Sequence, residues 1–269
     1  MSLPIIGITM GDPAGIGPEI IVKSLMKNRN FKDCSIIVIG DSNCLRNEAK
    51  KNNLDLEINI CESLSNIKNI NKPIVNCLNV GGKIDNVQYG YNSDISGEAS
   101  YLYINKAVEL ALKNKINAIC TAPISKKALQ MAGYNFPGHT ELLAYLTKTK
   151  EVSLMLSTPK MNVIHVTTHI GLIDAIKKID SNLVFRTIER GRDLIKKLIH
   201  KEPRIGVCAI NPHAGEDGLF GYGEEESKII PAINKTIELN WNVKGPIPAD
   251  SLFYQASLDR FDLIVAMYH

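Results

Sequence analysis

The sequence has 269 residues, of which 45% are hydrophobic and 22% are charged, the composition of an ordinary globular protein with one large domain or two of ordinary size. Its 31 basic and 28 acidic residues leave a formal net charge of only +3, which argues against binding to nucleic acid or to acidic membrane surfaces. We find no apolar run of about 18 residues and no secretion signal, and the six cysteines follow no Cys-x-x-Cys spacing. We therefore expect a cytoplasmic protein whose cysteines are reduced core residues.

Short apolar runs rich in β-branched residues alternate with longer amphipathic segments along the chain. The runs predicted to be buried strands are residues 5–10, 35–40, 116–121, 153–157, 162–168, 204–210 and 261–267. Amphipathic spacing predicts helices that begin near Ser96 and Ser181. Residues 57–88 are rich in asparagine and poor in strand patterns, so we expect an irregular edge or connection there. The alternation predicts a layered α/β fold with a largely parallel sheet.

In such folds, the loops at the carboxyl ends of the strands carry the chemistry. Residues 11–19 follow the first predicted strand and contain three glycines. These glycines and Pro18 suit a tight turn before a helix whose free N–H groups could face an anion. The turn lacks the third glycine of a dinucleotide fingerprint and the Gly-Lys-Ser/Thr ending of a P-loop. A turn without a ligand fits the pattern equally well.

A second cluster follows the strand that ends at Thr121. Lys126 and Lys127 stand at a helix start, where positive charge opposes the helix dipole. A phosphate ligand would explain them, and a solvated basic face is the alternative. His139 and Thr140 would begin the next helix after a Pro-Gly turn. Both could bind a polar substrate, although a helix N-cap explains Thr140 equally well.

Three histidines each follow a predicted strand: His169, His213 and His269. If these strand ends share one sheet edge, the three side chains could bind a divalent metal, although their separations along the chain carry no ligand spacing. His165 alternates with the apolar residues of its strand, so we expect it to be buried in the core or to support a neighbouring ligand. Asp250 could act as a general base or cap a helix.

Seven segments become familiar when they are taken together. They are GDPAGIGPE at 11–19, TAP at 121–123, GHTE at 138–141, TTH at 167–169, NPHAGE at 211–216, PADSLF at 248–253 and AMYH at 266–269. In this order they closely resemble the motifs of the 4-hydroxythreonine-4-phosphate dehydrogenase family, and the resemblance covers the whole chain. It implies an isocitrate/isopropylmalate-dehydrogenase-like two-domain α/β/α fold, a homodimer with its active site at the subunit interface, and a step of pyridoxal phosphate biosynthesis.

The resemblance also implies a reaction and its site. NAD or NADP oxidises the hydroxyl of 4-phosphohydroxy-L-threonine, and the resulting β-keto acid loses carbon dioxide to give 3-amino-2-oxopropyl phosphate. His139 and Thr140 match substrate-binding positions, while His169, His213 and His269 match the ligands of one divalent ion per subunit, such as zinc, magnesium or cobalt. Such an ion would polarise the reacting oxygen. To these we add Lys126 as a substrate ligand and Asp250 as the catalytic base.

The same resemblance sets expectations for the domains. The family continues past its tyrosine-histidine pair, so we expect a C-terminal truncation that removes the last part of the first domain. Residues 1–125 with 245–269 would form that domain, and residues 126–244 the second, with the dimer interface. Three other functions stay open: a dehydrogenase of a phosphorylated sugar acid, a non-catalytic remnant, and a metal-dependent hydrolase in which the histidine-bound ion activates water.

Overall fold

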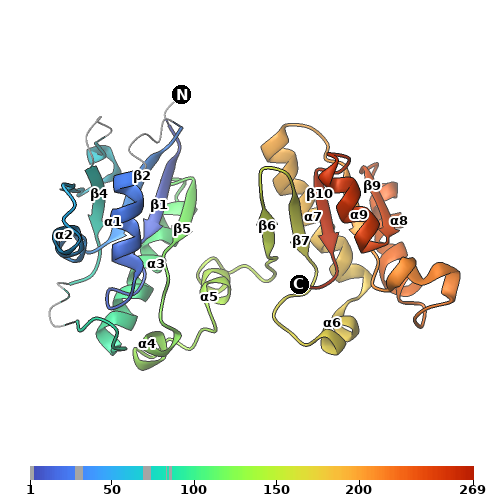
Figure 1. Ribbon diagram of the computed structural model, residues 1–269, viewed down its shortest axis with the longest axis horizontal. Helices are drawn as coiled ribbons and strands as arrows, with labels where there is room; N and C mark the ends of the chain where they lie inside the picture. Colours follow the sequence, from blue (N-terminus) through green and yellow to red (C-terminus); the bar gives the residue numbers. More distant parts are fainter. Residues whose placement is uncertain (1–2, 28–32, 69–73, 83, 85–86) are drawn as a thin grey trace. The chain divides into compact units, whose positions relative to one another are not determined.

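The structure is a computed structural model that describes residues 3–27, 33–68, 74–82, 84 and 87–269. The chain divides into two compact units, Met1–Glu151 and Val152–His269, and each is built on its own five-stranded sheet (Figure 1). None of the helices in these ranges is long and apolar enough to cross a membrane. Each of the seven runs predicted as strands contains a strand, so the strands are confirmed. The expected burial is wrong for residues 118–121 and 155–157, which are exposed or half-buried.

The first unit is a parallel sheet in the order β3-β4-β2-β1-β5. Its strands are β1 (Ile5–Thr9), β2 (Ser35–Gly40), β3 (Glu57–Ile60), β4 (Ile74–Asn79) and β5 (Ala118–Thr121). Its helices are α1 (Gly17–Lys27), α2 (Ser42–Lys51), α3 (Asp94–Leu112), α4 (Lys126–Met131) and α5 (His139–Leu146), with a 3-10 turn η1 (Leu64–Asn66). Since crossovers are right-handed, α1 and α2, which step toward β3, cover one face, and α3, which returns to β5, covers the other. Figure 1 shows α1 in front of the sheet and α3 behind it.

The expectation of an irregular stretch at residues 57–88 is wrong, because β3 and β4 lie there and pair in parallel. The polar residue that obscured the pattern, Asn76, is buried in β4. Its side chain accepts from the Asn59 side chain at 2.9 Å and from the Lys68 N–H at 2.9 Å. A buried amide satisfied in this way is compatible with an inner strand.

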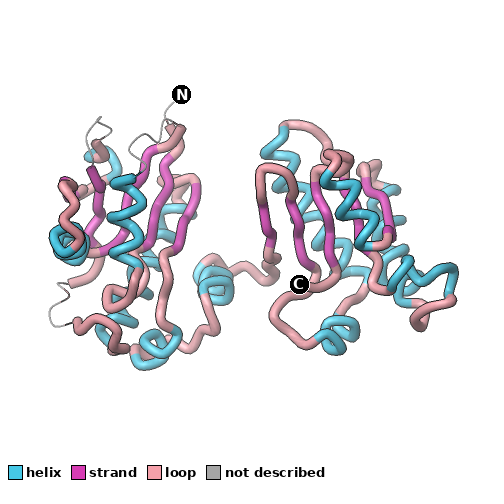
Figure 2. The backbone as a smooth tube through the Cα atoms, viewed as in Figure 1, coloured by secondary structure: helices cyan, strands magenta, loops and turns pink. Residues whose placement is uncertain are grey.

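The second unit is a mixed sheet in the order β6-β7-β10-β8-β9, in which only the β6–β7 pair is antiparallel among the described pairs. Its strands are β6 (Met155–Ser157), β7 (Asn162–His165), β8 (Ile205–Cys208), β9 (Val243–Ile247) and β10 (Leu263–Ala266). Its helical segments are α6 (Leu172–Lys178), α7 (Ser181–Ile199), η2 (Pro212–Gly218), η3 (Glu225–Ile229), α8 (Ile230–Glu238) and α9 (Ala249–Ser257). Figure 2 shows how helices and strands alternate in both units.

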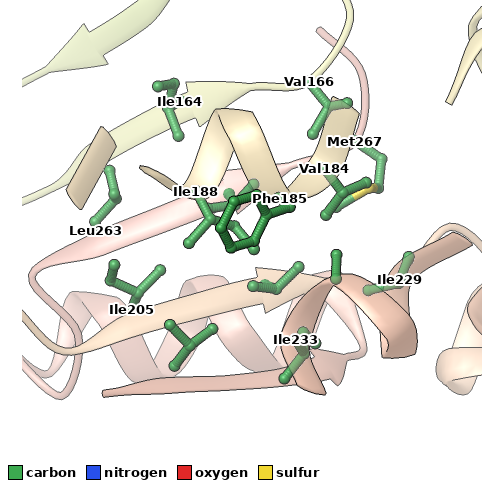
Figure 3. Close-up of a cluster of buried hydrophobic side chains, with 14 of the residues drawn as sticks. Ile164, Val166, Val184, Phe185, Ile188, Ile205, Ile229, Ile233, Leu263 and Met267 are labelled. Atoms are coloured by element: carbon green, nitrogen blue, oxygen red, sulfur yellow. The ribbon is translucent and has the colours of Figure 1, made fainter. Parts of the chain in front are cut away.

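The larger core of the second unit lies between the sheet and the helices α7 and α8. Ile164, Ile205 and Leu263 come from three neighbouring strands, and Ile188 from α7 packs on them (Figure 3). A smaller core on the opposite face forms under α9 around Leu252. The sheet is therefore covered on both faces, as the sequence predicted.

The predicted domain division does not match the two units. Residues 126–151 group with the first unit, and residues 245–269 add β10 and the end of β9 to the second sheet. β10 pairs with β7 and β8, and Leu263 lies opposite Ile205. An apolar strand buried at the centre of the second sheet belongs to that unit, whatever its distance along the chain.

Two further details differ from the expectations. The long helix α3 begins at Asp94, and Ser93 is its N-cap, while Ser96 completes a capping box three residues later. Of the cysteines, which are all free thiols, Cys120 is exposed, because it lies on β5 at the edge of the first sheet. Three cysteines are buried as expected: Cys61, Cys77 and Cys208.

Candidate functional site

The glycine-rich turn after β1 packs against the segment that follows β5. Gly11 has a φ of +73°, and a Cβ atom there would lie 2.3 Å from the carbonyl oxygen of Pro123, so only glycine fits. The Asp12 N–H donates to the same oxygen at 3.0 Å, and the Asp12 carboxylate accepts from the Ala14 N–H at 2.8 Å. Burial raises the pKa of Asp12, while hydrogen bonds from Ala14 and Ser96 act in the opposite direction. These contacts tie β1, β5 and α3 together and account for Gly11 and Asp12 without an anion.

His139 keeps one imidazole nitrogen without a partner. It is the first residue of α5, and its Nε2 atom is buried with no hydrogen bond to any residue in the described ranges. Burial lowers the pKa of His139, and a hydrogen bond with the backbone of Ala122 works in the opposite direction. The imidazole is therefore neutral near pH 7. A buried polar atom without a partner calls for an explanation, and a bound polar ligand would supply one.

The other predicted substrate and catalytic residues lie at helix starts. Thr140 is in the first turn of α5, whose N-cap is Gly138, so the N-cap explanation of Thr140 is wrong. Lys126 is exposed at the start of α4, and Ser125 caps that helix by accepting from the Ala128 N–H. Asp250 is exposed in the first turn of α9, whose N-cap is Pro248. The cap explanation therefore fails for Asp250 as well.

His169 and His269 lie beside each other in the second unit. Both follow neighbouring strands, β7 and β10, and the Thr167 hydroxyl donates to the Met267 carbonyl at 2.9 Å, which holds the two strand ends together. The imidazole centroids of His169 and His269 are 6.1 Å apart. Both rings line a cavity of about 210 Å³, with Thr167, Thr168, Ile170, Leu172 and Tyr268 as its other lining residues.

His165 is buried next to this pair, as expected, with 7% of its surface exposed. Its ring stands edge-on to His269, with the centroids 5.0 Å apart. Burial lowers the pKa of His165, a hydrogen bond with the Leu154 backbone raises it, and the charge of His269 lowers it. His165 therefore stays neutral near pH 7 and supports the His269 ring by packing.

His213 does not join the other two histidines. It follows β8 in the turn η2, and its ring is 6.4 Å from that of Phe220. Metal–nitrogen bonds are about 2.0–2.1 Å long, so three imidazole ligands must converge on one point. Nowhere in the described part of the chain are three or more histidine, cysteine, aspartate or glutamate side chains placed to hold an ion. The expected three-histidine site is therefore not assembled within one chain.

One buried carboxylate in this region was missed in the sequence. Glu225 is 2% exposed and accepts hydrogen bonds from the segment that leads into the His213 turn. Helical spacing could have revealed this glutamate. Glu225 is four residues before Ile229 and eight before Ile233, and both isoleucines are buried. One glutamate of the run 224–226 therefore had to lie on the buried face of the helix.

Two α/β units with imidazole and hydroxyl groups beyond the carboxyl ends of their strands are typical of an enzyme that acts on a small polar substrate. Residues 32–269 match the family described as "Pyridoxal phosphate biosynthetic protein PdxA", and the chain belongs to that family. The family predicted from the sequence motifs is thus confirmed, as is the α/β fold class.

Three of the similar proteins are named as dehydrogenases of phosphorylated hydroxy acids. D-threonate 4-phosphate dehydrogenase from Cupriavidus necator is 51% identical over 267 residues, which cover 99% of this chain and 80% of that protein. The enzyme of the same name from Salmonella typhimurium is 38% identical, over 100% of this chain and 82% of that protein. The crystal structure of a 4-hydroxythreonine-4-phosphate dehydrogenase from Burkholderia phymatum is 52% identical, with a TM-score of 0.93 over 100% of this chain and 81% of that one.

Proposed function

We propose that this chain is a metal- and NAD(P)-dependent dehydrogenase of a four-carbon hydroxy acid phosphorylated at C4, with D-threonate 4-phosphate as its substrate. The observation that carries the proposal is the 51% identity, over 99% of this chain, to a D-threonate 4-phosphate dehydrogenase. The second candidate substrate is 4-phosphohydroxy-L-threonine, since the Burkholderia phymatum structure, at 52% identity, bears the corresponding name. The two acids differ at C2, which carries a hydroxyl group in the first and an amino group in the second.

The proposed reaction balances for either acid. The C3 carbon gives up a hydride, for which bound NAD(P) would be the acceptor, and the C3 hydroxyl oxygen gives up a proton. The product is a β-keto acid, which loses its carboxylate as carbon dioxide and takes up a proton at C2. A hydroxyl group at C2 leads to 3-hydroxy-2-oxopropyl phosphate, and an amino group leads to 3-amino-2-oxopropyl phosphate.

We assign no residue to the nicotinamide cofactor. In the first turn, the space beside Gly17 is filled by the Met10 carbonyl, whose oxygen would lie 2.3 Å from a Cβ atom at Gly17. This glycine therefore serves the packing of the turn on β1.

Each predicted substrate or catalytic residue has a role that its chemistry allows. The free Nε2 of His139 and the Thr140 hydroxyl would hydrogen-bond the polar groups of the substrate. The exposed ammonium group of Lys126 would pair with the phosphate. The Asp250 carboxylate would accept the hydroxyl proton. Lys126, Thr140 and Asp250 are exposed at helix starts, where a small ligand can reach them.

We further propose that a divalent ion is bound between two copies of the chain. His169 and His269 share one cavity in the second unit, whereas the described part of one chain holds no three-residue metal site. In a homodimer with its active site at the interface, His213 of one copy could complete the pair of the other copy.

Mixing inactive variants tests this sharing. H213A and H269A should each lack activity, and a mixture that is unfolded and refolded together should regain part of it, because a mixed dimer keeps one complete set of three histidines. H169A mixed with H269A is the matched control and should stay inactive, since both lesions fall in the same cavity. A mixture of H213A and H269A that stays inactive although mixed dimers form would contradict a shared site.

The substrate is tested by NAD(P)H formation. Each acid is offered with NAD or NADP and with zinc, magnesium or cobalt, and the proposal expects a higher kcat/KM for D-threonate 4-phosphate. A higher value for 4-phosphohydroxy-L-threonine would select the second candidate. Phosphate release without any need for nicotinamide would instead support the hydrolase, and a folded protein that binds the acids without turnover would support the non-catalytic alternative.

A further inference from the structure

The Glu225 carboxylate holds the backbone that leads into the His213 turn. Its Oε1 atom accepts from the Ile210 N–H at 2.9 Å and from the Asn211 N–H at 2.7 Å, and its Oε2 atom accepts from the Asn211 side-chain amide at 2.9 Å. The side chain is nearly inaccessible to solvent, with Glu225 2% exposed. Hydrogen bonds to a buried carboxylate are among the strong ones, so residues 210 and 211 are fixed relative to η3.

The turn that follows has an unfavourable backbone and needs such support. All residues from His213 to Asp217 have positive φ values, between 44° and 80°, and only Gly215 among them adopts that region without strain. A Cβ atom at Gly215 would lie 3.2 Å from the Glu225 Oε2 atom. The turn therefore folds back over the same carboxylate that anchors its start.

The segment η3, which contains Glu225, also holds the segment that follows His169. Lys228 donates from Nζ to the carbonyl oxygens of Ile176, at 2.6 Å, and Ile179, at 2.9 Å. These carbonyls end α6, and the first residue of α6, Leu172, lines the cavity of His169. Glu225 and Lys228 both belong to η3, a π-helical turn, a rare geometry that is frequent at functional sites.

We propose that Glu225 is a positioning residue, which holds the His213 turn in its left-handed conformation, and that Lys228 holds α6 from the same π-helical turn. Both side chains bind backbone groups of the second unit. The catalytic consequence of this inference rests on the proposed dehydrogenase activity, whereas the structural consequence does not. A turn released from Glu225 would relax toward ordinary backbone conformations and carry His213 away from its present place.

The variant that tests this is E225Q, with E226Q as its matched control. The glutamine amide keeps the size of the side chain. In one orientation its NH₂ group faces the two backbone N–H groups, and in the other it faces the Asn211 amide. In both cases two hydrogen-bond donors face each other and at least one hydrogen bond is lost. Glu226 is the exposed neighbour, so E226Q removes the same charge without touching the turn.

Amide hydrogen exchange gives the readout that does not depend on activity. E225Q should exchange the Ile210 and Asn211 amides roughly 10- to 100-fold faster, the factor expected for losing charge-assisted hydrogen bonds, while Leu263 and Val265 in β10 keep their protection. K228Q should speed exchange at the end of α6 alone. If E225Q does not fold, N211A, which removes the side-chain hydrogen bonds to Glu224 and Glu225 but keeps the two backbone ones to Glu225, should show the same pattern at a smaller size.

Kinetics give the second readout. E225Q should lower kcat/KM at least tenfold at temperatures well below its melting transition, and E226Q should match the wild type. Unchanged exchange at Ile210 and Asn211, or an E225Q enzyme with wild-type kinetics, would overturn the inference. A wild-type chain without dehydrogenase activity would contradict the proposed function only, because the exchange experiment would still decide the role of Glu225.

Discussion

Replacing Gly97 by alanine should destabilise the first unit, although alanine is the better helix former. Gly97 lies in α3 where the backbone of α4 crosses it: a Cβ atom there would be 2.0 Å from the Ala128 carbonyl oxygen and 2.9 Å from the Leu129 nitrogen. Normal contact is near 3.5 Å, so α4 must move by more than an ångström. Overpacking costs about 1–3 kcal/mol, and the upper end applies because backbone atoms cannot rotate away. The helix gains about 1 kcal/mol from alanine, which leaves a net loss of about 2 kcal/mol.

This loss can be assigned to one unit, because the only tryptophan in the sequence, Trp241, lies in the other. Urea or thermal unfolding followed by far-UV circular dichroism reports on both units, and Trp241 fluorescence reports on the second. A loss of about 2 kcal/mol corresponds to roughly 4–8 °C for a unit of about 150 residues. Gly82→Ala, where the added Cβ meets nothing within 4 Å, is the control. A G97A chain as stable as the wild type would refute the packing argument.

Three other outcomes are expected. H139Q should raise the KM for the phosphorylated acid at least tenfold without changing the melting temperature, since the buried Nε2 of His139 has no partner among the described residues and a polar ligand would supply one. Steady-state kinetics beside a melting curve would show whether it does. The free energy of unfolding should fall as the pH is lowered through about 6.5, because burial lowers the pKa of His165 and the unfolded chain then binds more protons. Urea titrations at about pH 7.5 and about pH 5.5 should show a smaller fall for H165N than for the wild type. An equal fall in both proteins would count against the role of His165. W241A should lower the free energy of unfolding by about 3 kcal/mol. Trp241 stacks on Phe185 with ring centroids 5.6 Å apart, and the Arg192 guanidinium lies 4.4 Å from the Trp241 ring centroid. An unchanged urea midpoint would show that the stack contributes nothing to stability.

The sequence predicted the strands that are apolar along their whole length, because burial on both faces requires such runs. It missed β4, whose Asn76 is satisfied by Asn59 and by the backbone of Lys68. Those partners are 17 and 8 residues away, so no local pattern could show that the amide would be paired. The division into domains failed for a related reason: which sheet a strand such as β10 joins depends on its neighbours in space.

The candidate site was predictable in part. The rule that parallel strands end at one sheet edge predicted that His169 and His269 lie close together, and both rings line one cavity. It could not place His213, since a strand end fixes where a loop begins but not where its turn leads. The left-handed backbone of η2 depends on the buried Glu225. No sequence motif marks a glutamate whose carboxylate accepts hydrogen bonds from backbone N–H groups.

The strand order of the second sheet has a consequence for synthesis of the chain on the ribosome. All strands of the first sheet lie within residues 5–121, so that sheet can close while later residues are still being added. In the second sheet, the inner strand between β7 and β8 is β10, at residues 263–266. Until it emerges, no strand links β7 to β8, and their apolar faces and unpaired backbone edges stay open to other nascent or unfolded chains. The first unit can therefore fold cotranslationally, whereas the second must wait for about a hundred residues after β7, the interval in which chaperone protection matters most.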